Sequence, residues 1–112
     1  QLRIVDGEGQ AVGAALDPRR YYEYLDERAE PSSYMKFPYY KPLGYPNGMY
    51  RVGPLARLNV ATNMGTERAD REFVEFHQRS EGAVNAAFHY HLARLIEMVG
   101  ALERMERLFA DP

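Results

Sequence analysis

The feature that most limits the fold of this 112-residue chain is a run of prolines in its middle. Five of the seven prolines lie between Pro31 and Pro54. Proline has no amide hydrogen and a fixed φ, so this spacing excludes a continuous helix and a long central strand. Most of the nine tyrosines lie in or near the same stretch, which indicates packing rather than disorder. We expect an ordered, extended connector with short strands at Tyr34–Phe37 and Met49–Val52 and a turn at Pro46-Asn47-Gly48.

The segment before the connector predicts a hairpin followed by a helix. Leu2–Val5 alternates weakly and contains β-branched residues, Asp6-Gly7-Glu8-Gly9 offers turn chemistry, and Gln10–Ala14 can return as the second strand. Asp17-Pro18 is typical of a helix start, because aspartate accepts from free amides and proline tolerates the first helical position. We expect this helix to span about Pro18–Arg28.

The segment after the connector predicts a helical hairpin. Thr66 can cap a helix over about Glu67–Arg79, which has apolar residues at helical spacing. A longer amphipathic helix follows over about Val84–Phe109, and at about 1.5 Å per residue it would be nearly 40 Å long. Its apolar stripe repeats every seven residues, widened by Leu92 and Val99: Phe88, Leu95, Leu102 and Phe109, with His91, Met98 and Met105 offset by three. The predicted fold class is therefore α+β, with an N-terminal β-hairpin and short strands, the Pro/Tyr-rich connector and this helical hairpin.

Composition narrows the possible functions. The length suits a single domain over residues 1–112. The net charge of −2 is spread evenly, which gives little support to nucleic-acid binding. No apolar run approaches the length of about 18 residues that spans a membrane. The absence of cysteine excludes disulfides, thiolate metal sites and cysteine nucleophiles within these residues.

Few residues are candidates for a catalytic or metal-binding site. His89 and His91 could share a metal on a strand, but the pattern around them is helical and separates them by about 200°. We expect His91 to be a hydrogen-bonded core residue and His89 to lie nearer the surface. Arg94 and Glu97 lie three residues apart and predict a surface or interface ion pair on one helical face. The alternative is that Arg94 reaches towards a neighbouring segment. No phosphate loop or hydrolase motif is present, so we assign no catalytic, cofactor-binding or metal residue.

The stretch KFPYYKPLGYPNGMYRVGPLARLNV (Lys36–Val60), with Gly53-Pro54-Leu55-Ala56-Arg57 at its centre, resembles the middle of a nickel–iron hydrogenase large (alpha) subunit. Together with FHYHLARLIE (Phe88–Glu97) it looks most like the cytoplasmic, multimeric branch of that family, which is linked to NAD(P) or other soluble carriers. The resemblance runs, with gaps, from about Leu2 to Asp111. It implies that Arg51 and Arg57 flank a scaffold turn, and we expect Arg57 to be a buried, paired arginine.

The resemblance also implies what this chain does not carry. That family holds a nickel–iron centre with two Cys-x-x-Cys pairs, and both are missing here. The full-length parent would be an oxidoreductase that splits dihydrogen reversibly, partnered by a small iron–sulfur subunit. The chain begins without methionine and ends just after a helical run, so we interpret it as an internal fragment. We expect it to be a structural scaffold, located in the cytoplasm, that binds no nickel and is inactive alone.

The alternative is a stand-alone, metal-free interaction module that associates through the long C-terminal helix. The broad apolar stripe of that helix is the feature that favours association, because a small body cannot bury it. We therefore expect the isolated chain to form a homo-oligomer. An unrelated small enzyme has no motif in its favour.

Overall fold

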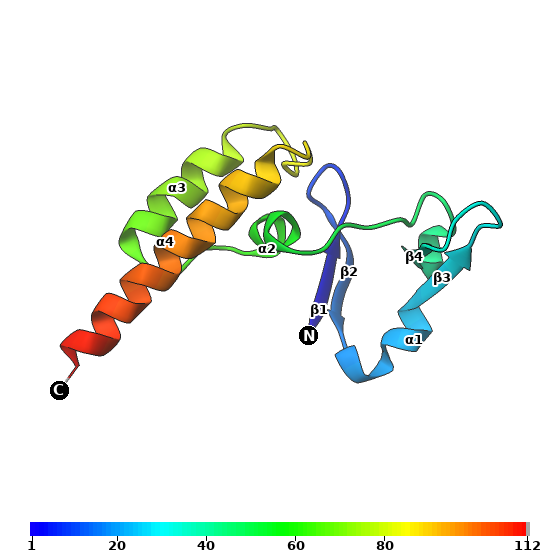
Figure 1. Ribbon diagram of the computed structural model, residues 1–112, viewed down its shortest axis with the longest axis horizontal. Coiled ribbons are helices and arrows are strands. Elements are labelled where there is room, and N and C mark those ends of the chain that lie inside the picture. Colours follow the sequence, from blue (N-terminus) through cyan, green and yellow to red (C-terminus); the bar gives the residue numbers. More distant parts are fainter. Residues whose placement is uncertain (112) are drawn as a thin grey trace. The chain divides into compact units, whose positions relative to one another are not determined.

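The computed structural model describes residues 1–111, and it has the mixed α+β fold that the sequence predicts. Helices and two small antiparallel sheets follow one another along the chain (Figure 1). The chain divides into two compact units. The first contains residues 1–3 and 13–51, and the second contains residues 4–12 and the described chain from Val52 onwards. That residues 1–112 act as one domain stays a prediction.

The predicted N-terminal hairpin is confirmed. It consists of β1 (Leu2–Val5) and β2 (Ala11–Leu16), which pair as a two-stranded sheet. Asp6 closes the loop, because its Oδ1 accepts hydrogen bonds from the amides of Glu8 (3.1 Å) and Gln10 (2.8 Å). A short aspartate side chain is well suited to this position, since it can reach the backbone two residues further on.

The predicted helix over Pro18–Arg28 is wrong beyond its first turns. A 3₁₀ turn, η1 (Pro18–Arg20), leads into a one-turn helix, α1 (Tyr21–Tyr24), and the chain then extends as β3 (Leu25–Ala29). This strand pairs antiparallel with β4 (Lys36–Tyr40), from Leu25 opposite Tyr40 to Ala29 opposite Lys36. The ladder satisfies the backbone groups that a helix would have satisfied, so tertiary pairing overrides a weak local preference.

The connector contains one of its two predicted strands. β4 begins at Lys36 rather than Tyr34 and leads into the 3₁₀ turn η2 (Lys41–Leu43). Of the predicted strand Met49–Val52, only Met49 pairs, in an isolated bridge to Tyr39. The predicted turn before it is present. Gly48 is required there because a Cβ would clash with the carbonyl oxygen of Tyr40.

The second unit is mainly helical, with α2 (Pro54–Val60), α3 (Glu67–His77) and α4 (His89–Ala110). The predicted helical hairpin is confirmed: α3 and α4 lie side by side (Figure 1). Ala69, Phe73 and Phe76 lie on the buried face of α3, as their spacing predicts. The core contains buried residues from all three helices and the loop before α4: Leu55, Leu58, Phe73, Phe76, Val84, Ala93 and Ile96.

The long helix begins later than predicted. Val84 is not helical because Asn59 binds both of its backbone groups: the Val84 amide donates to Asn59 Oδ1 (2.9 Å), and Asn59 Nδ2 donates to the Val84 carbonyl (3.0 Å). The chain turns helical only at His89. Within residues 1–111, none of the helices has the length and apolarity needed to cross a membrane.

Candidate functional site

The segment Gly53–Arg57, which the sequence singles out, is the N-cap and first turn of α2 rather than an isolated turn. Gly53 stands before the helix with a φ of 87°, a value that favours glycine. Pro54 follows at the first helical position, where its missing amide costs nothing. Leu55 and Leu58 are each 1% exposed, so the helix is fixed in place by its apolar side. This geometry directs Arg57 away from the core.

Arg57 reaches from α2 to α4 and forms a forked ion pair with Glu97. Its Nε donates to Oε1 at 2.6 Å and its Nη2 donates to Oε2 at 2.8 Å. The hydrogen bonds from Arg57 lower the pKa of the Glu97 carboxyl, against the partial desolvation that raises it. The same hydrogen bonds raise the pKa of the Arg57 guanidinium. Two parallel bonds of this kind set an orientation as well as a contact.

Two predictions about these charges are corrected. Glu97 binds Arg57 and not Arg94, which acts on the carboxylate only as a weaker, more distant positive charge. Arg57 is paired as predicted, but it is not buried, since its side chain is 60% exposed. Leu55 and Leu58 occupy the buried side of α2, so Arg57 lies on the side of this helix that faces solvent. Arg51, the other flanking arginine, is exposed.

Asn59 is a functional position of the scaffold that the sequence analysis missed. Besides its two hydrogen bonds to Val84, its Nδ2 donates to the carbonyl of Leu55 at 3.0 Å. The side chain therefore joins α2 to the segment that enters α4. Tyr90 adds a second link, because its hydroxyl donates to the carbonyl of Val52 at 3.1 Å. In the sequence, the role of Asn59 is indicated only by a polar residue that stands among apolar ones near the end of a helix.

The three histidines do not gather into a site. His91 is exposed, whereas the Nδ1 of His89 is buried and its ring packs edge-on against Phe76, with centroids 6.3 Å apart. The prediction of a core His91 is therefore wrong, because α4 turns its other face to the core, whereas His89 is half-buried at the edge of that core. His77 lies against Phe73, and its Nε2 is 3.3 Å from the carbonyl oxygen of Leu58.

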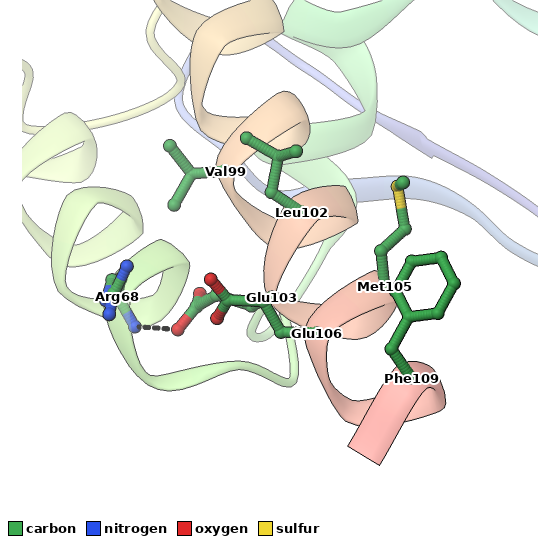
Figure 2. A pocket seen from close by; sticks show the side chains of 7 residues that line it. All are labelled: Arg68, Val99, Leu102, Glu103, Met105, Glu106 and Phe109. Atoms are coloured by element: carbon green, nitrogen blue, oxygen red, sulfur yellow. Dashed lines mark hydrogen bonds between the residues drawn. The ribbon is translucent and has the colours of Figure 1, made fainter. Parts of the chain in front are cut away.

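Glu103 on α4 caps the first turn of α3. Its carboxylate accepts from the amide of Arg68 at 2.9 Å (Figure 2) and from the amide of Ala69 at 3.0 Å, two groups that have no partner inside the helix. Desolvation raises the pKa of Glu103, but the two amides, together with the nearby Thr66 side chain and the charge of Arg68, outweigh it, and the net effect lowers the pKa to about 2. Thr66 occupies the N-cap position of this helix, as predicted, but its buried side chain makes no capping hydrogen bond.

An apolar hollow of about 390 Å³ lies beside this cap, along the C-terminal half of α4. Figure 2 shows Val99, Leu102, Met105 and Phe109 following one another along the helix there. Glu103 and Glu106 lie next to them, and Arg68 lies across from α3.

The residues present do not fit the nickel–iron centre that the sequence resemblance implies. The chain contains no cysteine, so it offers no thiolate for a soft metal. No group of three or more histidine, aspartate or glutamate side chains that could hold a metal exists among residues 1–111. The arrangement of Arg57, Glu97 and Asn59 is that of a structural junction, and no step of hydrogen chemistry is assigned to it.

The chain is similar to hydrogenase subunits over nearly its whole length, although no family model matches it. It is 45% identical over 110 residues to a subunit of the F420-non-reducing hydrogenase vhu of Methanocaldococcus jannaschii, covering 98% of this chain and 26% of that protein. It is 39% identical over 113 residues to the beta subunit of the NAD-reducing hydrogenase HoxS of Cupriavidus necator, covering 100% and 23%. The chain thus spans about a quarter of the length of these relatives.

The fold has a counterpart in a solved structure. A chain in the crystal structure of NAD+-reducing [NiFe]-hydrogenase in the H2-reduced state matches with a TM-score of 0.87 and 41% identity. The match covers 97% of this chain and 24% of that one. The α+β fold is therefore the fold of a segment found within a longer hydrogenase chain.

The assignment to the large (alpha) subunit of a nickel–iron hydrogenase is corrected by these relatives. They are named as other subunits, among them the beta subunit of HoxS, and each is matched over only about a quarter of its length. The statement that the comparisons support is coarser: this chain is related to a segment of subunits from F420-non-reducing and NAD-reducing hydrogenases.

Proposed function

We propose that this chain is a structural segment of a hydrogenase subunit that works within a multisubunit hydrogenase complex. The observation that carries the proposal is the agreement of fold and sequence over 97% of the chain with one chain of a solved hydrogenase. The complex would oxidise dihydrogen reversibly, in the cytoplasm, together with an iron–sulfur subunit. The nickel–iron centre would be held by residues outside this segment.

The scaffold role rests on how the second unit is connected. Arg57 and Asn59 both project from α2, and they bind α4 and the chain entering α4 respectively. Buried leucines of the same helix fix it against the core. Such a junction holds helices at a set angle and supplies no nucleophile, acid or metal ligand. Its proposed contribution is to keep the hydrogenase subunit folded within its complex.

The test compares the natural complex with the isolated chain. The protein that carries this sequence is purified from its host through an affinity tag, and hydrogen-dependent reduction of a viologen dye is measured. We expect activity in that preparation and none in the isolated 112-residue chain. A tagged preparation that reduces no dye under hydrogen, or an isolated chain that does, would overturn the proposal.

The second candidate function is a stand-alone interaction module. It is favoured by one observation, the apolar outer side of α4, where Leu95, Met98 and Leu102 are each more than half exposed. In this case the protein in cells would consist of these residues alone, and the tagged preparation would contain no iron–sulfur subunit. The intact mass of the polypeptide in the same preparation distinguishes the two.

A further inference from the structure

The helix α4 is apolar on two sides, and only one of them is covered in the described chain. Its inner side packs on α2 and α3 through Ala93, Ile96 and Gly100, which are buried. Its outer side carries a seam at alternating spacings of three and four residues, in which each side chain is about half exposed or more: Leu95, Met98, Leu102, Met105 and Phe109.

The outer side is also wide. A two-helix coiled coil usually has charged residues flanking its apolar seam, and these charges set the partner and the register. Here several flanking positions are apolar instead: Val99 on one flank, and Ala101 and Leu108 on the other. Charged residues flank the seam at Arg94 and Glu106. A helix with apolar residues on two sides rather than one is typical of the interior of a larger protein. Glu97 does not break this pattern, because Arg57 neutralises it on the inner flank.

The occupant follows from the length of the relatives. The solved chain with this fold continues for about three-quarters of its length outside the matched part, and so do the curated relatives. We infer that the outer side of α4 is an internal helix–helix interface, covered by apolar helices of the same polypeptide that lie outside these 112 residues. This inference rests on the proposed function. It goes further in naming the surface through which the segment joins the rest of its subunit.

The absence of cysteine from the segment gives a direct test. Leu102→Cys is introduced into the natural polypeptide and into the isolated chain, and labelling by a maleimide is followed over time. The peptide between Arg94 and Arg104 reports on this position alone after trypsin digestion and mass spectrometry. Glu72→Cys, at an exposed position of α3, is the matched control for labelling of a folded surface in the isolated chain.

We expect the thiol introduced at position 102 of the isolated chain, diluted until its mass is that of a monomer, to react as fast as the control thiol at position 72. In the natural polypeptide we expect the thiol at position 102 to react more slowly by a factor on the order of 100, since labelling then requires local opening. Equal rates in the two proteins would overturn the inference. Loss of this protection when the natural polypeptide is diluted until it no longer self-associates would also overturn the inference. A second copy of the polypeptide, rather than its own helices, would then cover the outer side of α4.

Hydrogen-dependent dye reduction by the same preparation separates this inference from the proposed function. Rapid labelling of the Leu102→Cys variant in an active complex would reject the internal interface and leave the function intact. Protection in a preparation without hydrogen-dependent activity would reject the function and support the interface.

Discussion

Arg57 and Glu97 lie forty residues apart in the sequence and meet in a forked ion pair that joins the short helix α2 to the long helix α4. The pair stands at the border of the core, with the Glu97 side chain 23% exposed and that of Arg57 60% exposed. It is therefore partly screened by water, and its main effect is to fix the orientation of two helices.

We predict that Arg57→Ala lowers the free energy of unfolding of the chain by about 1 kcal/mol or less, the range typical of partly exposed ion pairs. Urea denaturation followed by circular dichroism measures the change. A double-mutant cycle between Arg57→Ala and Glu97→Ala should show coupling, whereas the matched cycle between Arg94→Ala and Glu97→Ala should show much less. Equal coupling in the two cycles would contradict the structure.

Asn59→Ala should be more damaging, with a loss of about 2 kcal/mol, because it leaves the partly buried amide and carbonyl of Val84 without their partner. The same denaturation experiment applies. Asn63→Ala is the control: its side chain is exposed and donates to the adjacent Thr62 at 3.5 Å, so the change should stay within about 0.5 kcal/mol. A similar loss in both variants would mean that the hydrogen bonds from Asn59 to Val84 do not contribute measurably to the free energy of unfolding.

Glu103 predicts a specific dependence of stability on pH. Its pKa in the folded chain is about 2, below the ordinary value of 4.5, so the carboxylate stabilises the fold fully above pH 4.5. This contribution is lost as the pH falls from there towards 2. Glu103→Gln should lower the midpoint of thermal unfolding at pH 7 and should flatten its fall between pH 4.5 and 2.

Glu106→Gln removes the same charge from the next turn of α4 and is the control for that experiment. Its pH profile should follow that of the unchanged chain. If Glu103→Gln and Glu106→Gln gave the same profile, the cap on α3 would not be the source of the effect.

The isolated chain is predicted to self-associate through the outer side of α4, because nothing else in the described residues covers the apolar seam. Light scattering at high micromolar concentration should give a mass above that of one chain. Leu102→Glu should restore the monomer, whereas the same change in charge on α3, Val74→Glu, should not, although Val74 is equally exposed at 57%. A strictly monomeric mass for the unchanged chain would contradict this prediction.

Much of the fold could be predicted because it depends on local patterns. The spacing of Ala69, Phe73 and Phe76 identified the buried side of α3, and Asp6 with its neighbouring glycines identified the first hairpin. The helix predicted over Pro18–Arg28 failed because Leu25–Ala29 is a strand only through its pairing with β4. That partner is separated from it by a loop, and no local propensity reports such a pairing.

The junction could be predicted only in part, since its bonds are long-range. The Arg57 side chain was expected to be paired, but Glu97 has an equally plausible partner at Arg94 on its own helix. Glu103 looks like an ordinary surface glutamate until the first turn of α3 is placed beside it. The histidines were misjudged because α4 has two apolar sides, and the seven-residue repeat marks the one that faces outward.

The central claim is that this segment supports a hydrogenase subunit without taking part in its chemistry, and Arg57→Ala in the natural complex tests it most directly. The quantity to measure is hydrogen-dependent dye reduction divided by the amount of assembled complex. We predict that the amount of assembled complex falls while the activity per assembled complex is unchanged. Normal assembly with a collapsed activity per complex would contradict the account, because Arg57 would then act in the reaction itself.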